Sequence, residues 1–135
     1  MIQRIQTVLL FLAAILNVCF IFTPLYDRAL EDPTAWISSG LFSALLLSSA
    51  VSLFSIFLYK NRPFQVRWVR RGMIFQVLGI GFATGIIFTL GGFGSFLLDE
   101  IISLALIVLV LILQYGAVHF ISKDDKLVKS MDRIR

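Results

Sequence analysis

Four long apolar runs, none of which contains a charged side chain, constrain this chain more than any other feature. The runs cover residues 8–25, 36–59, 72–98 and 101–121 of the 135-residue chain. Each is close to or above the roughly 20 apolar residues that a transmembrane helix needs. The chain is 59% hydrophobic and 15% charged, whereas soluble domains contain about 25% charged residues. The pattern predicts an all-α integral membrane protein.

A basic block over residues 60–71 sets the expected topology. It holds five of the twelve lysines and arginines and no acid. If the N-terminus, this block and residues 122–135 lie on one side of the membrane, eleven of the twelve basic residues lie there and only Arg28 lies opposite. The positive-inside rule then places both termini and the block in the cytoplasm. Because the loops are short, we expect an antiparallel four-transmembrane-helix bundle.

Local signals give the expected helix boundaries. We expect helices over about residues 5–25, 36–59, 64–90 and 99–121, in one transmembrane domain over residues 1–121. Pro24 and the polar residues after it are expected to end the first helix and form a loop. Residues 32–34 are expected to form a turn or helix start, and the glycine-rich residues 91–95 a turn. No small-residue cleavage site follows the first run, so we expect a retained helix rather than a secretory signal.

Residues 122–135 are expected to form a separate cytoplasmic tail. Ser122 and Asp125 have the spacing of a capping box, in a variant with aspartate in place of glutamate or glutamine. Leu127, Met131 and Ile134 would share one helical face. The tail is therefore predicted to contain a short amphipathic helix.

Small residues in the second and third runs are candidates for close helix packing. Gly40, Ala44 and Ser48 recur every four residues, and Gly81 and Gly85 form a GxxxG motif. Such spacings let helix backbones approach closely in lipid. We favour packing within the bundle, with a homo-oligomeric contact as the alternative.

Groups that carry catalysis or hold cofactors are scarce in the apolar runs. The chain has one histidine, His119, and one cysteine, Cys19. These cannot supply the three or four protein ligands of a zinc site or the paired axial histidines of a haem-bearing bundle. The positive charge lies beside apolar runs, which favours membrane topology and lipid over nucleic acid. We therefore expect no enzyme activity, no metal or other cofactor and no nucleic-acid partner.

Two groups of residues are candidate binding sites. The first would face anionic phospholipid headgroups or a membrane-protein partner, and consists of Lys60, Arg62, Arg67, Trp68, Arg70 and Arg71. The second is a polar pocket near the cytoplasmic ends of the helices, formed by Gln76, Gln114, Tyr115 and His119. Interhelical hydrogen bonding is the simpler interpretation of the second group. The tail acids Asp124, Asp125 and Asp132 are expected to dock on Arg67, Arg70 and Arg71.

Three segments, residues 1–7, 60–62 and 123–135, resemble a domain-of-unknown-function family of small four-helix inner-membrane proteins from Bacteroidota. The resemblance covers the whole chain and implies a bacterial inner-membrane location, but it implies no activity. The leading hypothesis is a non-enzymatic small membrane-complex subunit or lipid-associated scaffold that acts through its basic cytoplasmic face. The alternative is a small oligomeric transporter or channel that uses the glycine-rich third helix.

Overall fold

All regular elements in the described part of the chain are helices. The computed structural model describes residues 2–31, 35–90 and 97–134. The elements are α1 (Ile2–Cys19), the 3-10 turn η1 (Phe20–Phe22), α2 (Pro24–Leu30), α3 (Trp36–Phe57), α4 (Arg62–Leu90) and α5 (Leu97–Asp132). The turns expected at residues 32–34 and 91–95 lie outside the described residues. Four helices, one of them formed by α1 with η1, are long and apolar enough to cross a membrane.

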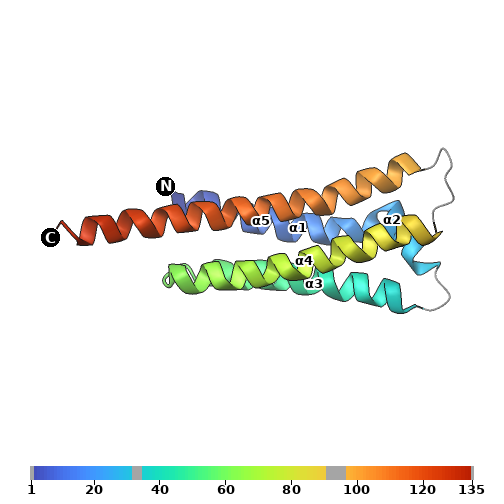
Figure 1. The fold of residues 1–135 in the computed structure, drawn as a ribbon, viewed down its shortest axis with the longest axis horizontal. Helices are drawn as coiled ribbons and strands as arrows, with labels where there is room; N and C mark the ends of the chain where they lie inside the picture. Colours follow the sequence, from blue (N-terminus) through green and yellow to red (C-terminus); the bar gives the residue numbers. More distant parts are fainter. Residues whose placement is uncertain (1, 32–34, 91–96, 135) are drawn as a thin grey trace.

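The four long helices pack lengthwise as a bundle, which confirms this part of the expected fold. Each packs on two others: α1 on α3 and α5, and α4 on the same two helices. Figure 1 shows both termini and the turn between α3 and α4 at one end of the bundle, with α2 at the other. We call these the basic end and the α2 end. The basic end therefore carries the block at residues 60–71.

Residues after Pro24 form helix α2, where a loop was expected. Proline suits the first position of a helix because its missing N–H has no partner there in any case. Thr23 is extended, with φ −97° and ψ 151°, and its hydroxyl donates to the carbonyl of Phe20 at 2.6 Å. Leu25 and Ala29 are fully buried. The short helix therefore covers the α2 end of the core.

The expectation of a separate short C-terminal helix is wrong. Helix α5 runs without a break from Leu97 to Asp132, because no glycine or proline after Gly116 interrupts it. The Lys129 ammonium lies 2.7 Å from the Asp125 carboxylate, one turn away, and supports the continuing helix. Figure 1 shows α5 projecting beyond the turn between α3 and α4.

The core consists of two apolar clusters separated along the bundle. One, towards the α2 end, contains Phe20, Leu25, Leu41, Leu45, Ile86 and Ile107. The other, towards the basic end, contains Leu10, Val69, Ala117, Val118 and Ile121. On α1, α4 and α5, buried amide side chains lie between the two clusters in sequence and so between them in space. The centre of the bundle is therefore a polar layer.

Candidate functional site

A reciprocal pair of amides joins α1 to α4 in the polar layer. The Asn17 Nδ2 donates to Gln76 Oε1 at 2.9 Å, and the Gln76 Nε2 donates back to Asn17 Oδ1 at 3.1 Å. The same Nε2 also donates to the backbone carbonyl of Ile107 at 3.0 Å. Gln76 is fully buried and Asn17 is 3% exposed. One glutamine therefore connects three of the four long helices.

Gln114 connects α5 to α3 in the same layer. Its Nε2 donates to the hydroxyl oxygens of Ser48 and Ser52, each at 2.9 Å. The Ser52 hydroxyl in turn donates to the carbonyl of Ser48. The Gln114 Oε1 is buried and has no hydrogen-bond partner among the residues that the structure describes.

The four residues of the predicted polar pocket do not gather in one place. Gln76 and Gln114 both lie inside the bundle, but they bond to different helices. Tyr115 is 64% exposed and His119 is exposed, so both lie on the outer surface of α5. The hydrogen-bonding side chains of the polar layer are amides and hydroxyls, which join the helices and carry no charge.

Aromatic rings lie beneath two of the three arginines Arg67, Arg70 and Arg71. Trp68 contacts Phe54 of α3 and Phe64 of α4, with ring centroids 5.2 Å and 6.1 Å away. The Arg71 guanidinium lies 4.8 Å from the centroid of Trp68, and the Arg67 guanidinium lies 5.3 Å from that of Phe64. Cation–π contacts of this kind hold an arginine without neutralising its charge.

Two of the three tail acids pair with residues other than Arg67, Arg70 and Arg71, which corrects the expected docking for Asp124 and Asp125. The Asp124 carboxylate lies 3.1 Å from Arg62 Nε, and Asp125 pairs with Lys129. The register explains this, because α4 and α5 run antiparallel with position 62 level with position 124. Residues 67–71 therefore lie five to nine residues, or about one and a half to two and a half turns, farther into the bundle than Asp124. In the described chain no ion pair involves Arg67, Arg70 or Arg71, and Lys60 is exposed.

The other end of the bundle holds a partly buried ion pair that the sequence did not indicate. The Arg28 Nε of α2 lies 3.0 Å from Glu100 Oε1 of α5. The Glu100 side chain is 6% exposed and the Arg28 side chain 36%. Glu100 lies in the first turn of α5, where a carboxylate also complements the helix dipole.

The candidate packing residues divide into an inner and an outer set. Ala44 and Ser48 are buried, and a Cβ built on Gly40 would lie 2.8 Å from Phe82 Cζ. Gly81 and Gly85 have no atom within 4 Å of such a Cβ. The small residues of α3 (Gly40, Ala44 and Ser48) thus pack inside the bundle, whereas the GxxxG motif of α4 faces outwards. The glycine of α4 in closest contact with α3 is Gly79, where a Cβ would lie 2.7 Å from Leu45 Cδ2.

This contrast predicts opposite responses at two glycines of one helix. We expect Gly79→Leu to lower the free energy of unfolding by about 2 kcal/mol or more, since the new side chain would overlap the buried Leu45. Gly81→Leu should leave it unchanged or raise it by up to about 1 kcal/mol, because leucine is the better helix former. Denaturant unfolding in detergent micelles measures both. Equal losses at the two positions would show that Gly81 is also packed.

No metal site is found in the described residues, which contain no group of three or more histidine, cysteine, aspartate or glutamate side chains able to hold an ion. The basic end and the polar layer are therefore the two features from which a function can be argued. The first offers exposed cations and the second offers only uncharged hydrogen-bonding groups.

Comparison with protein families gives one match. A family model described as a domain of unknown function (DUF4293) matches residues 2–134. The match covers nearly the whole chain, and it agrees with the resemblance of residues 1–7, 60–62 and 123–135 to a domain-of-unknown-function family. No curated protein and no solved structure matches the chain.

Proposed function

We propose, for a chain that belongs to the family of the domain of unknown function DUF4293, a role as a non-enzymatic, lipid-associated scaffold of the bacterial inner membrane. Both termini would lie in the cytoplasm, and the basic end would bind anionic phospholipid headgroups. Four helices of sufficient length and apolarity support the membrane location. The five basic residues of the block at residues 60–71 lie at the same end of the bundle as Lys123, Lys126 and Lys129 of α5, which supports the orientation.

The observation that carries the proposal is the state of Arg67, Arg70 and Arg71. All three are exposed, and within the described residues none has an ionic partner. An arginine fork binds phosphate oxygens in a bidentate manner. Basic residues beside a membrane contribute about 1 kcal/mol each to binding of anionic lipid. The neighbouring Trp68 is of the type that lies at headgroup depth.

Neutralising the three arginines should remove bound anionic lipid. We expect Arg67→Gln, Arg70→Gln and Arg71→Gln, combined, to lower the retained anionic phospholipid by about tenfold or more. Native mass spectrometry of the protein extracted gently from its own membrane measures the retained lipid. Of the nine remaining basic residues, only Arg28 lies in a segment expected on the opposite side of the membrane, so the topology should persist.

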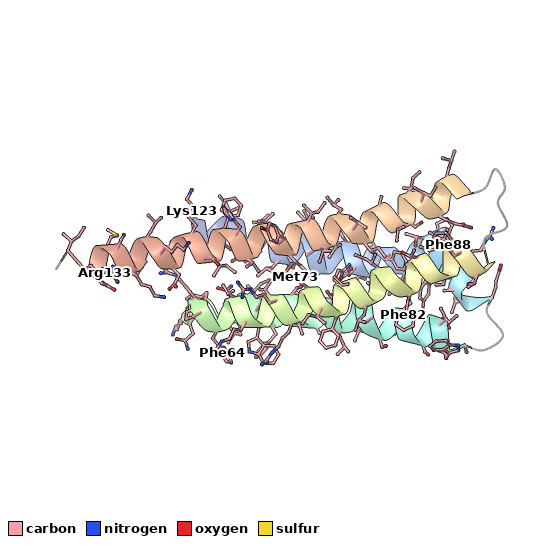
Figure 2. All side chains as sticks on the ribbon, viewed as in Figure 1. Phe64, Met73, Phe82, Phe88, Lys123 and Arg133 are labelled. Atoms are coloured by element: carbon pink, nitrogen blue, oxygen red, sulfur yellow. The ribbon has the colours of Figure 1, made fainter. Side chains whose placement is uncertain are left out.

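A second triple variant serves as the matched control. Lys123 and Lys126 are exposed near the C-terminal end of α5, and Arg133 is exposed directly after it; Figure 2 labels Lys123 and Arg133. Replacing them with glutamine removes the same amount of charge, but from residues outside the basic block at residues 60–71. We call the surface formed by Arg67, Arg70 and Arg71 the arginine face. Equal lipid loss in both triple variants would mean that total charge matters and that the arginine face has no special role.

A second candidate, a small subunit of a membrane-protein complex, rests on the projecting part of α5. There Leu127 and Met131 are 46% and 68% exposed, and Ile134, two residues beyond the end of α5, is 86% exposed. An apolar helical face of this kind is typical of a surface that docks into a partner's groove. Truncation after residue 122 should then remove a co-purifying protein and leave the retained lipid unchanged.

A further inference from the structure

A groove runs between α4 and α5 on the outer surface of the bundle. Its volume is about 580 Å³, and its lining includes Arg70, Ile74, Val77, Leu78, Leu111 and Tyr115. Figure 2 labels Met73, another lining residue, on the side of α4 that faces α5. Arg70 lies nearest the basic end, and the rest of the α4 wall is apolar.

We propose that this groove holds one acyl chain of an anionic phospholipid from the cytoplasmic leaflet, with the lipid phosphate bound to Arg70. The inference deepens the proposed function, since it rests on the same orientation of the basic end. It assigns lipid binding to Arg70 and this groove, whereas the broader proposal assigns it to Arg67, Arg70 and Arg71 together.

Arg70 is distinguished from its two neighbours by its surroundings. Arg67 and Arg71 each lie over an aromatic ring, whereas Arg70 lines the groove. Within the described part of the chain Arg70 has neither an ion pair nor a ring contact. Tyr115 on the opposite wall brings a hydroxyl that can donate to a phosphate or ester oxygen. The polar mouth thus complements a negatively charged headgroup.

The length of the apolar wall matches one leaflet. Gly81 lies eleven positions after Arg70, which is a rise of about 16 Å at about 1.5 Å per residue. Half of a hydrocarbon core about 30 Å thick is about 15 Å. A chain whose phosphate rests on Arg70 would therefore end near Gly81, in the middle of the bilayer.

Gly81 also leaves room at the far end of this path. A second hollow of about 380 Å³ lies on the α3 side of α4, where Trp36 of α3 and Val77, Leu78, Gly81 and Gly85 of α4 line it. It shares Val77 and Leu78 with the first groove. No atom lies within 4 Å of a Cβ built on Gly81 or Gly85. The acyl chain could therefore cross α4 at Val77 and Leu78 and end beside the outward-facing GxxxG motif, on the side of α4 that faces α3.

The test uses the full chain in detergent with added lipid and three single variants. Arg70→Gln removes the phosphate ligand, and Val77→Trp fills the groove while Arg70 stays. Arg67→Gln removes the same charge outside the groove. We expect Arg70→Gln and Val77→Trp each to lower bound phosphatidylglycerol by about fivefold, and Arg67→Gln by less than about twofold. Native mass spectrometry counts the bound lipids, with phosphatidylcholine as the zwitterionic comparison.

Each outcome separates the groove from the broader proposal. Equal losses in Arg67→Gln and Arg70→Gln, with none in Val77→Trp, would overturn the groove and leave the arginine face standing. Unchanged lipid in all three variants would overturn both. Binding of phosphatidylcholine as strong as that of phosphatidylglycerol would overturn the preference for anionic lipid. A change in oligomer mass in Val77→Trp would show that a second copy of the chain, and not a lipid, occupies the groove. Val77 is exposed, so the bundle should fold, and Ile74→Trp at the exposed neighbouring position repeats the test.

Discussion

Replacing Gln76 by leucine should lower the free energy of unfolding by about 3 kcal/mol. Interhelical hydrogen bonds in membranes contribute only about 0.6 kcal/mol each on average. The larger part of the loss should come from Asn17, whose buried amide would be left without its partner. An unsatisfied polar group in a water-free interior costs about 1–3 kcal/mol. Denaturant unfolding in detergent micelles, followed by circular dichroism, measures the change.

A double-mutant cycle separates the orphaned amide from the lost volume. Asn17→Leu alone should also destabilise the bundle, because it leaves the buried Gln76 Oε1 without its donor. When both residues are leucine, no amide of the pair is left unsatisfied, and at least half of the summed loss should be recovered. Tyr115→Phe, at an exposed position of α5, is the control with no expected effect. Strictly additive losses would show that the two amides do not depend on each other.

The apolar runs predicted the number of long helices, and the structure confirms it. Length and composition are local properties, so each run could be recognised on its own. The partner of a buried amide depends on the rotation and register of every helix at once. Gln76 and Gln114 were both identified as polar groups within the apolar runs, yet one bonds to α1 and the other to α3. Spacing along one helix carries no information on that choice.

Glycine motifs show the same limit. GxxxG at Gly81 and Gly85 is a well-known close-approach pattern, but in this bundle it faces outwards, and Gly79 makes the contact with α3. Two residues along a helix turn a side chain by more than half a turn, so a motif cannot say which face meets a neighbour. The continuation of α5 past Ser122 was missed for a related reason. A capping pattern marks a helix start only where something stops the preceding helix, and nothing does so there.

The ion pair at the α2 end should be the second most sensitive point of the fold. We expect Arg28→Met to lower the free energy of unfolding by about 2 kcal/mol, because it leaves the nearly buried Glu100 carboxylate without its cation. The expected loss is below the 3–5 kcal/mol, roughly, of a fully buried pair, since the Arg28 side chain is about one-third exposed. Arg28→Lys keeps the charge and should lose less.

Adding Glu100→Gln to Arg28→Met tests whether the unpaired charge causes the loss. Glutamine has nearly the shape of glutamate and carries no charge, so the double variant should recover about 1 kcal/mol or more relative to Arg28→Met alone. Asp27→Asn removes an exposed acid from the same short helix and should have little effect. A double variant less stable than Arg28→Met would mean that Glu100 acts through the N-terminus of α5 rather than through Arg28. Because the pair joins α2 to α5 at the end opposite the arginine face, its loss should leave lipid retention at the basic end unchanged.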